Sequence, residues 1–126
     1  MQFALLIYHS PEEFEMRKND YSDPHLSAWR GYHKALVEAG VYVSGDALEI
    51  PETASTVRVR EGKRRVQDGP FADTKEQLAG FIILELPSHD AALDWAARCP
   101  GASRGSVEVR PLAPEAKRRG FTGERD

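Results

Sequence analysis

Four ionisable side chains lie close together in the stretch from residue 68 to residue 80, and their types suit acid–base chemistry. Asp68, Asp73, Lys75 and Glu76 place three carboxylates and one amine within nine residues. Such a cluster beside a buried strand can shift the pKa of an acid or base toward the working pH. If the stretch forms an active site, Asp68 is the candidate general acid or base, and Lys75 and Glu76 position charge.

The same stretch also has a purely structural interpretation. Asp68 and Gly69 before Pro70 form a turn signal, because glycine accepts a positive φ and proline fixes φ near the value that a turn needs. Asp73 and Glu76 have the spacing of a capping box, which predicts one helical turn. Under this interpretation the polar residues serve turns and caps, and none of them is catalytic.

Apolar runs on either side of this stretch predict the strands that must position it. Residues 3–8 and 81–86 are rich in apolar side chains on both alternating faces, which is typical of central strands covered on both sides. Residues 41–48 predict another strand, in which Gly45 marks a bulge or a close approach to a second backbone. Residues 106–110 alternate between apolar and polar and predict the last strand.

Two segments have the spacing and caps of helices. Residues 25–39 are predicted to bury an apolar stripe made of Leu26, Trp29, His33, Leu36 and Val37. His33 on this stripe is either a packed histidine or a catalytic one. A second helix is predicted after Ser88, which is its N-cap, and ends near Cys99. The charged segment 12–23 predicts an exposed connection with a short helical piece.

A β-hairpin is predicted over residues 56–67, with its turn at Glu61 and Gly62. It carries five basic residues, Arg58, Arg60, Lys63, Arg64 and Arg65. No aromatic side chain lies between them and the formal net charge of the chain is −3, so the pattern indicates a solvated edge and not a nucleic-acid surface.

The composition bounds the class of protein. A chain of 126 residues fits one domain, predicted over 1–113, followed by a loosely ordered tail at 114–126. The apolar runs are too short for a membrane helix, and the strand-like start leaves no room for a signal peptide, so we expect a cytoplasmic protein with no membrane partner. The single cysteine, Cys99, excludes an internal disulfide and a cysteine-based zinc site.

The order of the elements predicts an architecture. Strand, helix, strand, hairpin, strand, helix, strand is a ferredoxin-like βαββαβ α+β sandwich with a hairpin inserted between its second and third core strands. Two helices cover only one face of such a sheet. Because two of the core strands are apolar on both faces, we expect a second copy to cover the other face in a homodimer.

The sequence resembles the DGPF-domain proteins, which are part of the wider YCII-related group. The resemblance spans nearly the whole domain, and Asp73 and Ala79 depart from it conservatively. The residues that carry it are Leu5-Leu6-Ile7-Tyr8, Glu38-Ala39-Gly40-Val41, Ser44-Gly45, Thr56-Val57-Arg58-Val59, Asp68-Gly69-Pro70-Phe71, Lys75-Glu76-Gln77-Leu78, Gly80-Phe81 and Gly105-Ser106-Val107-Glu108-Val109-Arg110-Pro111.

The resemblance implies a dimeric α+β barrel, a fold shared with small monooxygenases and muconolactone isomerase-like enzymes. It implies no established reaction, although an enzyme role has been suggested for the YCII-related group. DGPF proteins also often accompany extracytoplasmic-function sigma factors. By spacing, the histidine of the wider group's suggested site falls on Trp29 here, while His9 and His33 are not part of the motif.

Three functions remain open. The first is a small enzyme without metal or bound cofactor, acting on a cyclic or carbonyl-bearing molecule between helix and sheet. In that case the ligand-binding candidates are Tyr8, Trp29, His33 and Phe71. The second is a dimeric binding or regulatory module that meets a protein partner or a signal molecule, with a link to extracytoplasmic-function sigma factor signalling as one form of it. The third, metal binding through His25, His33 and carboxylates, lacks a paired ligand spacing, so we expect no metal.

Overall fold

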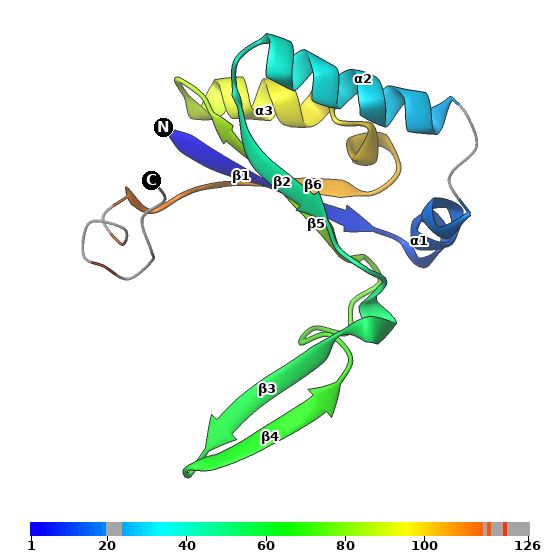
Figure 1. Ribbon diagram of the computed structural model, residues 1–126, viewed down its shortest axis with the longest axis vertical. Helices are drawn as coiled ribbons and strands as arrows, with labels where there is room; N and C mark the ends of the chain where they lie inside the picture. Colours follow the sequence, from blue (N-terminus) through cyan, green and yellow to red (C-terminus); the bar gives the residue numbers. More distant parts are fainter. Residues whose placement is uncertain (20–23, 115, 117–119, 121–126) are drawn as a thin grey trace.

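A four-stranded antiparallel sheet forms the centre of the molecule (Figure 1). The computed structural model describes residues 1–19, 24–114, 116 and 120. The sheet has the order β2-β5-β1-β6, which is the ferredoxin-like order that the sequence predicts, with the hairpin inserted between β2 and β5. Its strands are β1 (Gln2–His9), β2 (Tyr42–Ala47), β5 (Gln77–Glu85) and β6 (Ser106–Pro111). The predicted α+β class is therefore confirmed, and the described residues of the single chain form an open sheet and no closed barrel.

Helices α2 (His25–Glu38) and α3 (His89–Arg98) cover one face of this sheet (Figure 1). Between them and the sheet lies the core, which contains Phe3, Leu5 and Leu84, all fully buried. The alternation of buried side chains along β1 explains why Phe3 and Leu5 are in the core, because the odd-numbered residues of β1 face the helices. Ser88 caps α3 as predicted, since its hydroxyl accepts a bond of 3.1 Å from the backbone N–H of Ala91.

The predicted apolar stripe of α2 is partly wrong. Tyr32 and Leu36 are buried, whereas His33 and Val37 are exposed. The predicted stripe does not include Tyr32, whose hydroxyl donates a bond of 2.7 Å to the carbonyl oxygen of Trp95. A satisfied phenol can join a core, so the buried line of the helix is shifted by one residue from the expected one.

Helix α1 (Pro11–Lys18) is the short helical piece expected at 12–23, and two of its side chains are buried, which the expected exposed connection did not include. Ser10 caps it by accepting a bond of 3.2 Å from the backbone N–H of Glu13. Glu13 and Phe14 are buried, and the Phe14 ring packs edge-on against His9 with 5.2 Å between ring centroids. The helical piece is thus part of the fold, while residues 20–23 of the same prediction lie outside the described residues.

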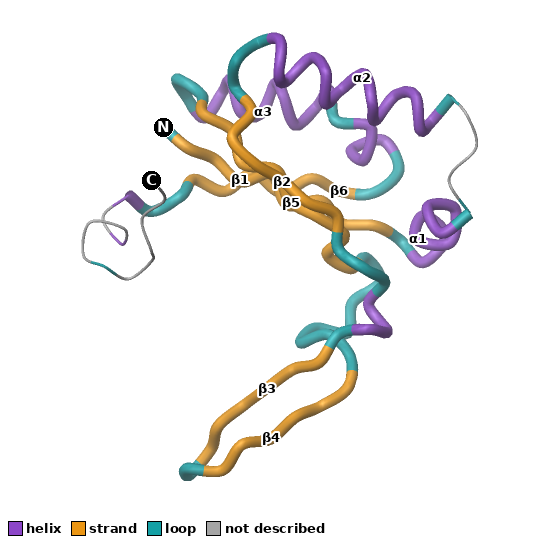
Figure 2. Tube along the Cα trace, viewed as in Figure 1, coloured by secondary structure: helices purple, strands orange, loops and turns teal. Residues whose placement is uncertain are grey.

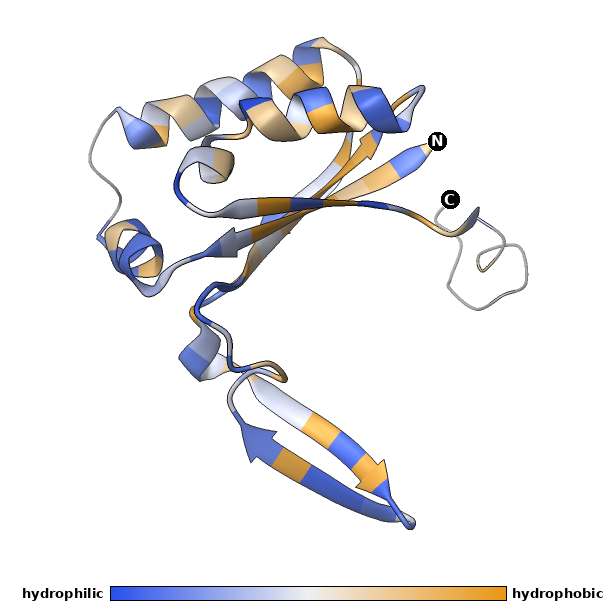
Figure 3. Ribbon diagram, turned by 180° about the vertical axis from the view of Figure 1, so that it is seen from behind, coloured by the Kyte–Doolittle hydropathy of each residue, from blue (hydrophilic) through white to orange (hydrophobic). Residues whose placement is uncertain are grey.

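Strands β3 (Ser55–Arg60) and β4 (Lys63–Asp68) form the predicted hairpin as a separate two-stranded sheet. Glu61 and Gly62 form its turn with positive φ values of 54° and 74°, the backbone of a type I′ turn. The hairpin projects away from the rest of the chain (Figures 1 and 2). Hydropathy alternates along β3, whereas β4 is hydrophilic except at one residue, Val66 (Figure 3). One face of the hairpin presents the exposed side chains of Val57, Val59 and Val66.

The loop from 69 to 76 contains no helical turn, so the capping-box prediction is wrong. Side chains satisfy this backbone in a different way. The Thr74 hydroxyl donates a bond of 2.6 Å to the carbonyl oxygen of Glu76, and the Gln77 side-chain amide donates bonds of 2.9 Å to the carbonyls of Ala72 and Thr74. These contacts hold the loop in bends that are incompatible with a helix.

The face of the sheet opposite α2 and α3 is apolar at its centre. Ala4 pairs with Ile83 across β1 and β5, and Leu6 pairs with Phe81. These four side chains are half-buried and lack the helical layer that covers the other face. The predicted tail at 114–126 falls largely outside the described residues. Within the described part of the chain, no helix has the length and apolar character needed to cross a membrane.

Candidate ligand-binding cavity

A cavity of about 300 Å³ lies between α2 and the sheet, at the β2 edge. Its lining comes from β1, α1, α2, β2 and β5. The volume is at the lower end of the range for small-molecule sites, and most of the lining is apolar or aromatic. The lining residues are Ile7, His9, Arg17, Trp29, Tyr32, His33, Leu36, Tyr42, Gly45, Asp46, Ala47, Ala79, Gly80, Phe81 and Ile82.

Two glycines allow the strands that form one wall to approach closely. A Cβ at Gly45 would lie 2.7 Å from the carbonyl oxygen of Phe81, and a Cβ at Gly80 would lie 2.8 Å from that of Asp46. Both distances are shorter than any normal contact of a Cβ atom. The prediction that Gly45 marks a close backbone approach is therefore confirmed, and a register shift occurs beside it in β2.

His9 is a buried titratable group in the lining, with 3% of its surface exposed. Burial lowers the pKa of its imidazole, and the positive charge of Arg17 acts in the same direction. The negative charge of Glu13 opposes the shift but does not cancel it. An imidazole with a lowered pKa is neutral at pH 7 and can accept a proton, which is the property of a general base.

Arg17 closes one end of the cavity. Its guanidinium donates a bond of 3.2 Å to the carbonyl oxygen of Ala79 and a second bond to the carbonyl oxygen of Leu48. It also lies over the ring of Phe14, with 5.1 Å from Cζ to the ring centroid. These contacts fix a permanent positive charge beside the aromatic lining.

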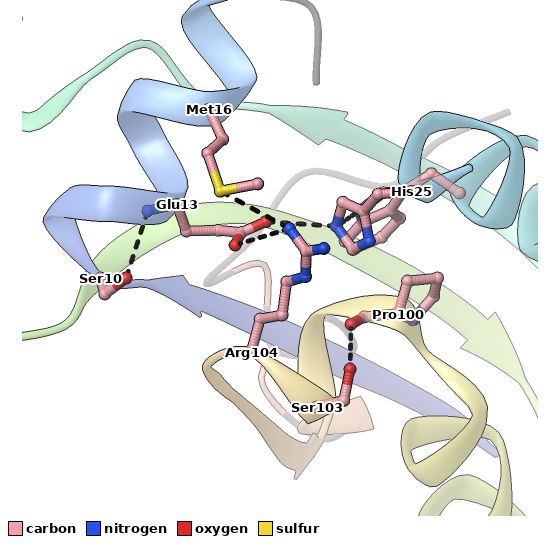
Figure 4. Close-up of polar contacts among 8 residues, drawn as sticks. Ser10, Glu13, Met16, His25, Pro100, Ser103 and Arg104 are labelled. Carbon is pink, nitrogen blue, oxygen red and sulfur yellow. Dashed lines mark hydrogen bonds and ion pairs between the residues drawn. The ribbon is translucent and has the colours of Figure 1, made fainter. Parts of the chain in front are cut away.

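Behind the cavity, a cluster of polar side chains, Glu13, His25 and Arg104, joins α1, α2 and the segment after the 3₁₀ helix η2 (Pro100–Ser103) (Figure 4). Glu13 Oε2 lies 3.2 Å from Nε2 of His25, and Glu13 Oε1 lies 3.5 Å from Nη1 of Arg104. Trp29 donates its indole N–H to the same His25 Nε2 at 3.1 Å. Trp29 lines the cavity, so the polar cluster contacts the cavity wall through the bond between His25 and Trp29.

The structure places two of the four predicted ligand-binding residues in the cavity lining, Trp29 and His33. His33 lies edge-on to Tyr42, with ring centroids 4.8 Å apart. Tyr8 faces the other side of the sheet, where its hydroxyl donates a bond of 3.1 Å to Glu108. Phe71 is 78% exposed and lies under the guanidinium of Arg58.

None of the three predicted acid–base and charge-positioning residues lines this cavity. Asp68 ends β4 and is exposed, and Lys75 is exposed in the following loop. The carboxylate of Glu76 accepts a bond of 2.6 Å from the hydroxyl of Ser106, which ties the loop to β6. The ionisable part of the stretch that the sequence singled out, residues 68–76, thus lies at the base of the hairpin, apart from the cavity, whereas Ala79 and Gly80 at its end line the cavity.

Three polar residues of the lining were not identified from the sequence: His9, Arg17 and Asp46. His9 carried a signal, because it continues the alternation of Phe3, Leu5 and Ile7 and so belongs to the helix-facing side of β1. Asp46 follows the close approach at Gly45, and Arg17 carried no local signal, since its partners lie on distant strands.

Cys99 is packed as its sequence position suggests. It is 2% exposed, and burial raises the pKa of its thiol to about 11, so the thiol stays protonated at neutral pH. Over residues 1–19 and 24–114, no three histidine, cysteine, aspartate or glutamate side chains are grouped so that they could hold a metal ion.

Comparison with known proteins gives three results. Residues 1–116 match the model of the YCII-related domain. An uncharacterised protein of Rhizobium meliloti (strain 1021) is 36% identical over 115 residues, covering 90% of this chain and 93% of that protein. A solved structure of similar fold is 5-chloro-2-hydroxyhydroquinone dehydrochlorinase from Burkholderia phenoliruptrix AC1100, in complex with 2,5-dihydroxybenzoquinone. It is 17% identical, with a TM-score of 0.51, over 90% of this chain and 94% of that one.

Proposed function

This chain belongs to the YCII-related domain family, and on that basis we propose that it is a small enzyme acting on a cyclic hydroxylated or quinone-like molecule in the helix–sheet cavity. The observation that carries the proposal is an aromatic cavity that holds a buried histidine and a fixed arginine at one end. The reaction uses side chains of the chain itself, without a resident metal or cofactor.

The shape and lining of the cavity favour a flat ligand. Trp29, Tyr32 and Tyr42 contribute aromatic rings to a space of about 300 Å³, which suits a single ring with a few substituents. Aromatic rings at such contacts add about 0.5–1.5 kcal/mol per pair beyond the burial of area. His33 and Asp46 add polar contacts for the ligand's substituents.

The polar end of the cavity suits proton abstraction from a ring hydroxyl. In the proposed step the neutral imidazole of His9 takes the proton, the O–H bond breaks, and the negative charge stays on the ligand oxygen. The guanidinium of Arg17, fixed by its bonds to two backbone carbonyls, stabilises that charge. We place the acid–base role on His9 and not on Asp68, because His9 lines the cavity and Asp68 does not.

The solved structure of similar fold supports this class of ligand through the activity and the bound molecule that its name states. That protein is a dehydrochlorinase solved with 2,5-dihydroxybenzoquinone, a flat hydroxylated ring. Such a molecule has the size and the oxygen substituents that the cavity described above would accommodate. It is therefore the first probe for binding, together with hydroquinone.

Calorimetric titration of the protein with 2,5-dihydroxybenzoquinone and hydroquinone tests the proposal. We expect saturable binding of at least one probe, weakened about tenfold or more in His9→Gln because a buried polar contact is lost. Asp68→Asn is the matched control, since it removes an exposed charge outside the cavity. Its affinity for the same probe should stay within about twofold of the wild-type affinity. Unchanged binding in His9→Gln, or loss of binding in Asp68→Asn, would contradict the assignment.

We also propose that the apolar face formed by Ala4, Leu6, Phe81 and Ile83 is covered by a second copy in a homodimer. The support is that these half-buried side chains lack the helical layer present on the other face. Sedimentation should give twice the chain mass of 14.1 kDa. Leu6→Glu should shift it to the chain mass, whereas Val37→Glu, on the exposed side of α2, should not. A wild-type chain that stays monomeric at millimolar concentration would contradict the homodimer.

A binding or regulatory module is the second candidate. The specific observation in its favour is apolar exposure away from the cavity, at Phe71 and on the valine face of the hairpin. Exposed apolar groups rimmed by polar residues mark interaction surfaces, and the basic residues of the hairpin would complement an acidic protein. This candidate gains if neither probe binds while Phe71→Ala leaves the dimer intact and abolishes binding to such a partner.

A further inference from the structure

The Nε2 atom of His25, behind the cavity, lies close to one hydrogen-bond donor and one acceptor, which require it to be unprotonated and protonated, respectively. The indole N–H of Trp29 donates to Nε2 of His25 at 3.1 Å, and the Oε2 atom of Glu13 lies 3.2 Å from the same Nε2. His25 is 8% exposed and Glu13 is 4% exposed, so solvent has little access to either contact. Figure 4 shows the carboxylate of Glu13 directed at His25.

The two contacts exclude each other. An imidazole nitrogen without a proton has one lone pair, which accepts the Trp29 bond; a nitrogen with a proton donates, and then its partner is the Glu13 carboxylate. Glu13 Oε2 accepts no hydrogen bond from another described residue in the present arrangement. The observed Trp29 contact therefore belongs to the unprotonated nitrogen, and a second arrangement with Nε2–H donating to Glu13 is available within 3.2 Å.

We propose that His25 is a positioning residue for the cavity: its unprotonated Nε2 accepts the indole N–H of Trp29 and so holds Trp29 in the wall. The inference rests on the proposed function in one respect, because it takes the cavity to be the ligand site.

The groups around His25 have contacts of their own. Arg104 contacts the other carboxylate oxygen of Glu13. His9 of β1 and Arg17 of α1 also face this cluster. Within the described residues, the Trp29 indole N–H donates to His25.

The indole N–H resonance of Trp29 in the ligand-free protein reports the bond directly. The chain has two tryptophans, and Trp95→Phe assigns their signals. At a single pH near 8, we expect slower exchange of the Trp29 indole proton in the wild type than in His25→Leu, which removes the acceptor. His25→Gln keeps an acceptor and should show exchange close to that of the wild type.

Affinity for hydroquinone should follow the same pattern. At one pH, we expect it to be about five- to tenfold weaker in His25→Leu than in the wild type, and close to the wild type in His25→Gln. If hydroquinone does not bind at all, the proposed function fails, yet the indole signal still decides the positioning role. Equal exchange in wild type and His25→Leu near pH 8 would overturn it.

Discussion

Replacement of Phe3 by alanine should lower the free energy of unfolding by about 3–5 kcal/mol, the usual cost of removing a fully buried phenylalanine. Phe3 has no exposed surface, lies between the sheet and the helices, and packs edge-on against His89 at 5.8 Å between ring centroids. Neither residue lines the cavity, so the loss comes from the core alone. Urea unfolding of both chains measures the difference.

Phe71→Ala is the matched control, because it makes the same chemical change at a side chain that is 78% exposed. Its free energy of unfolding should change by no more than about 0.5 kcal/mol. A cost for Phe71→Ala as large as that for Phe3→Ala would contradict the burial of the two rings in this fold.

Gly105→Ala should be destabilising by about 3 kcal/mol or more. A Cβ at Gly105 would lie 2.2 Å from the carbonyl oxygen of Tyr8, and a backbone oxygen within β1 cannot move aside cheaply. The glycine therefore serves a close approach where β6 begins beside the end of β1. Thermal unfolding of the variant should show a clearly lower midpoint, while the native secondary structure is kept.

Gly31→Ala provides the comparison on the same residue type. Gly31 lies within α2, and a Cβ there meets no atom within 4 Å. Because alanine favours helix by about 1 kcal/mol over glycine, this variant should be slightly more stable than the wild type. A similar response of the two variants would show that close packing at Gly105 is not what determines the effect.

The fold was predictable because its signals are local. Both faces of residues 3–8 are apolar, Ser88 precedes a helix, and Glu61-Gly62 lies between two alternating runs. Each of these patterns fixes one element, and the order of the elements then limits the topology. The errors occurred where a polar group had a distant partner, as with Tyr32, whose hydroxyl is satisfied by the backbone at Trp95.

The candidate site was less predictable because it is assembled from five elements. Asp68, Lys75 and Glu76 are dense in sequence, but the base of the hairpin carries them away from the cavity. His9, Arg17 and Asp46 are isolated in sequence and meet only after β1, α1 and β2 pack together. Spacing along a chain cannot reveal such a set unless a motif with known geometry spans it.

Crystallography of the protein soaked with 2,5-dihydroxybenzoquinone tests the central claim most directly. We predict a flat molecule in the cavity between α2 and the sheet, stacked near Trp29 and Tyr42, with one oxygen toward His9. A molecule bound instead beside Asp68 and Phe71, or an empty cavity at saturating concentration, would contradict the account and return the search to the hairpin surface.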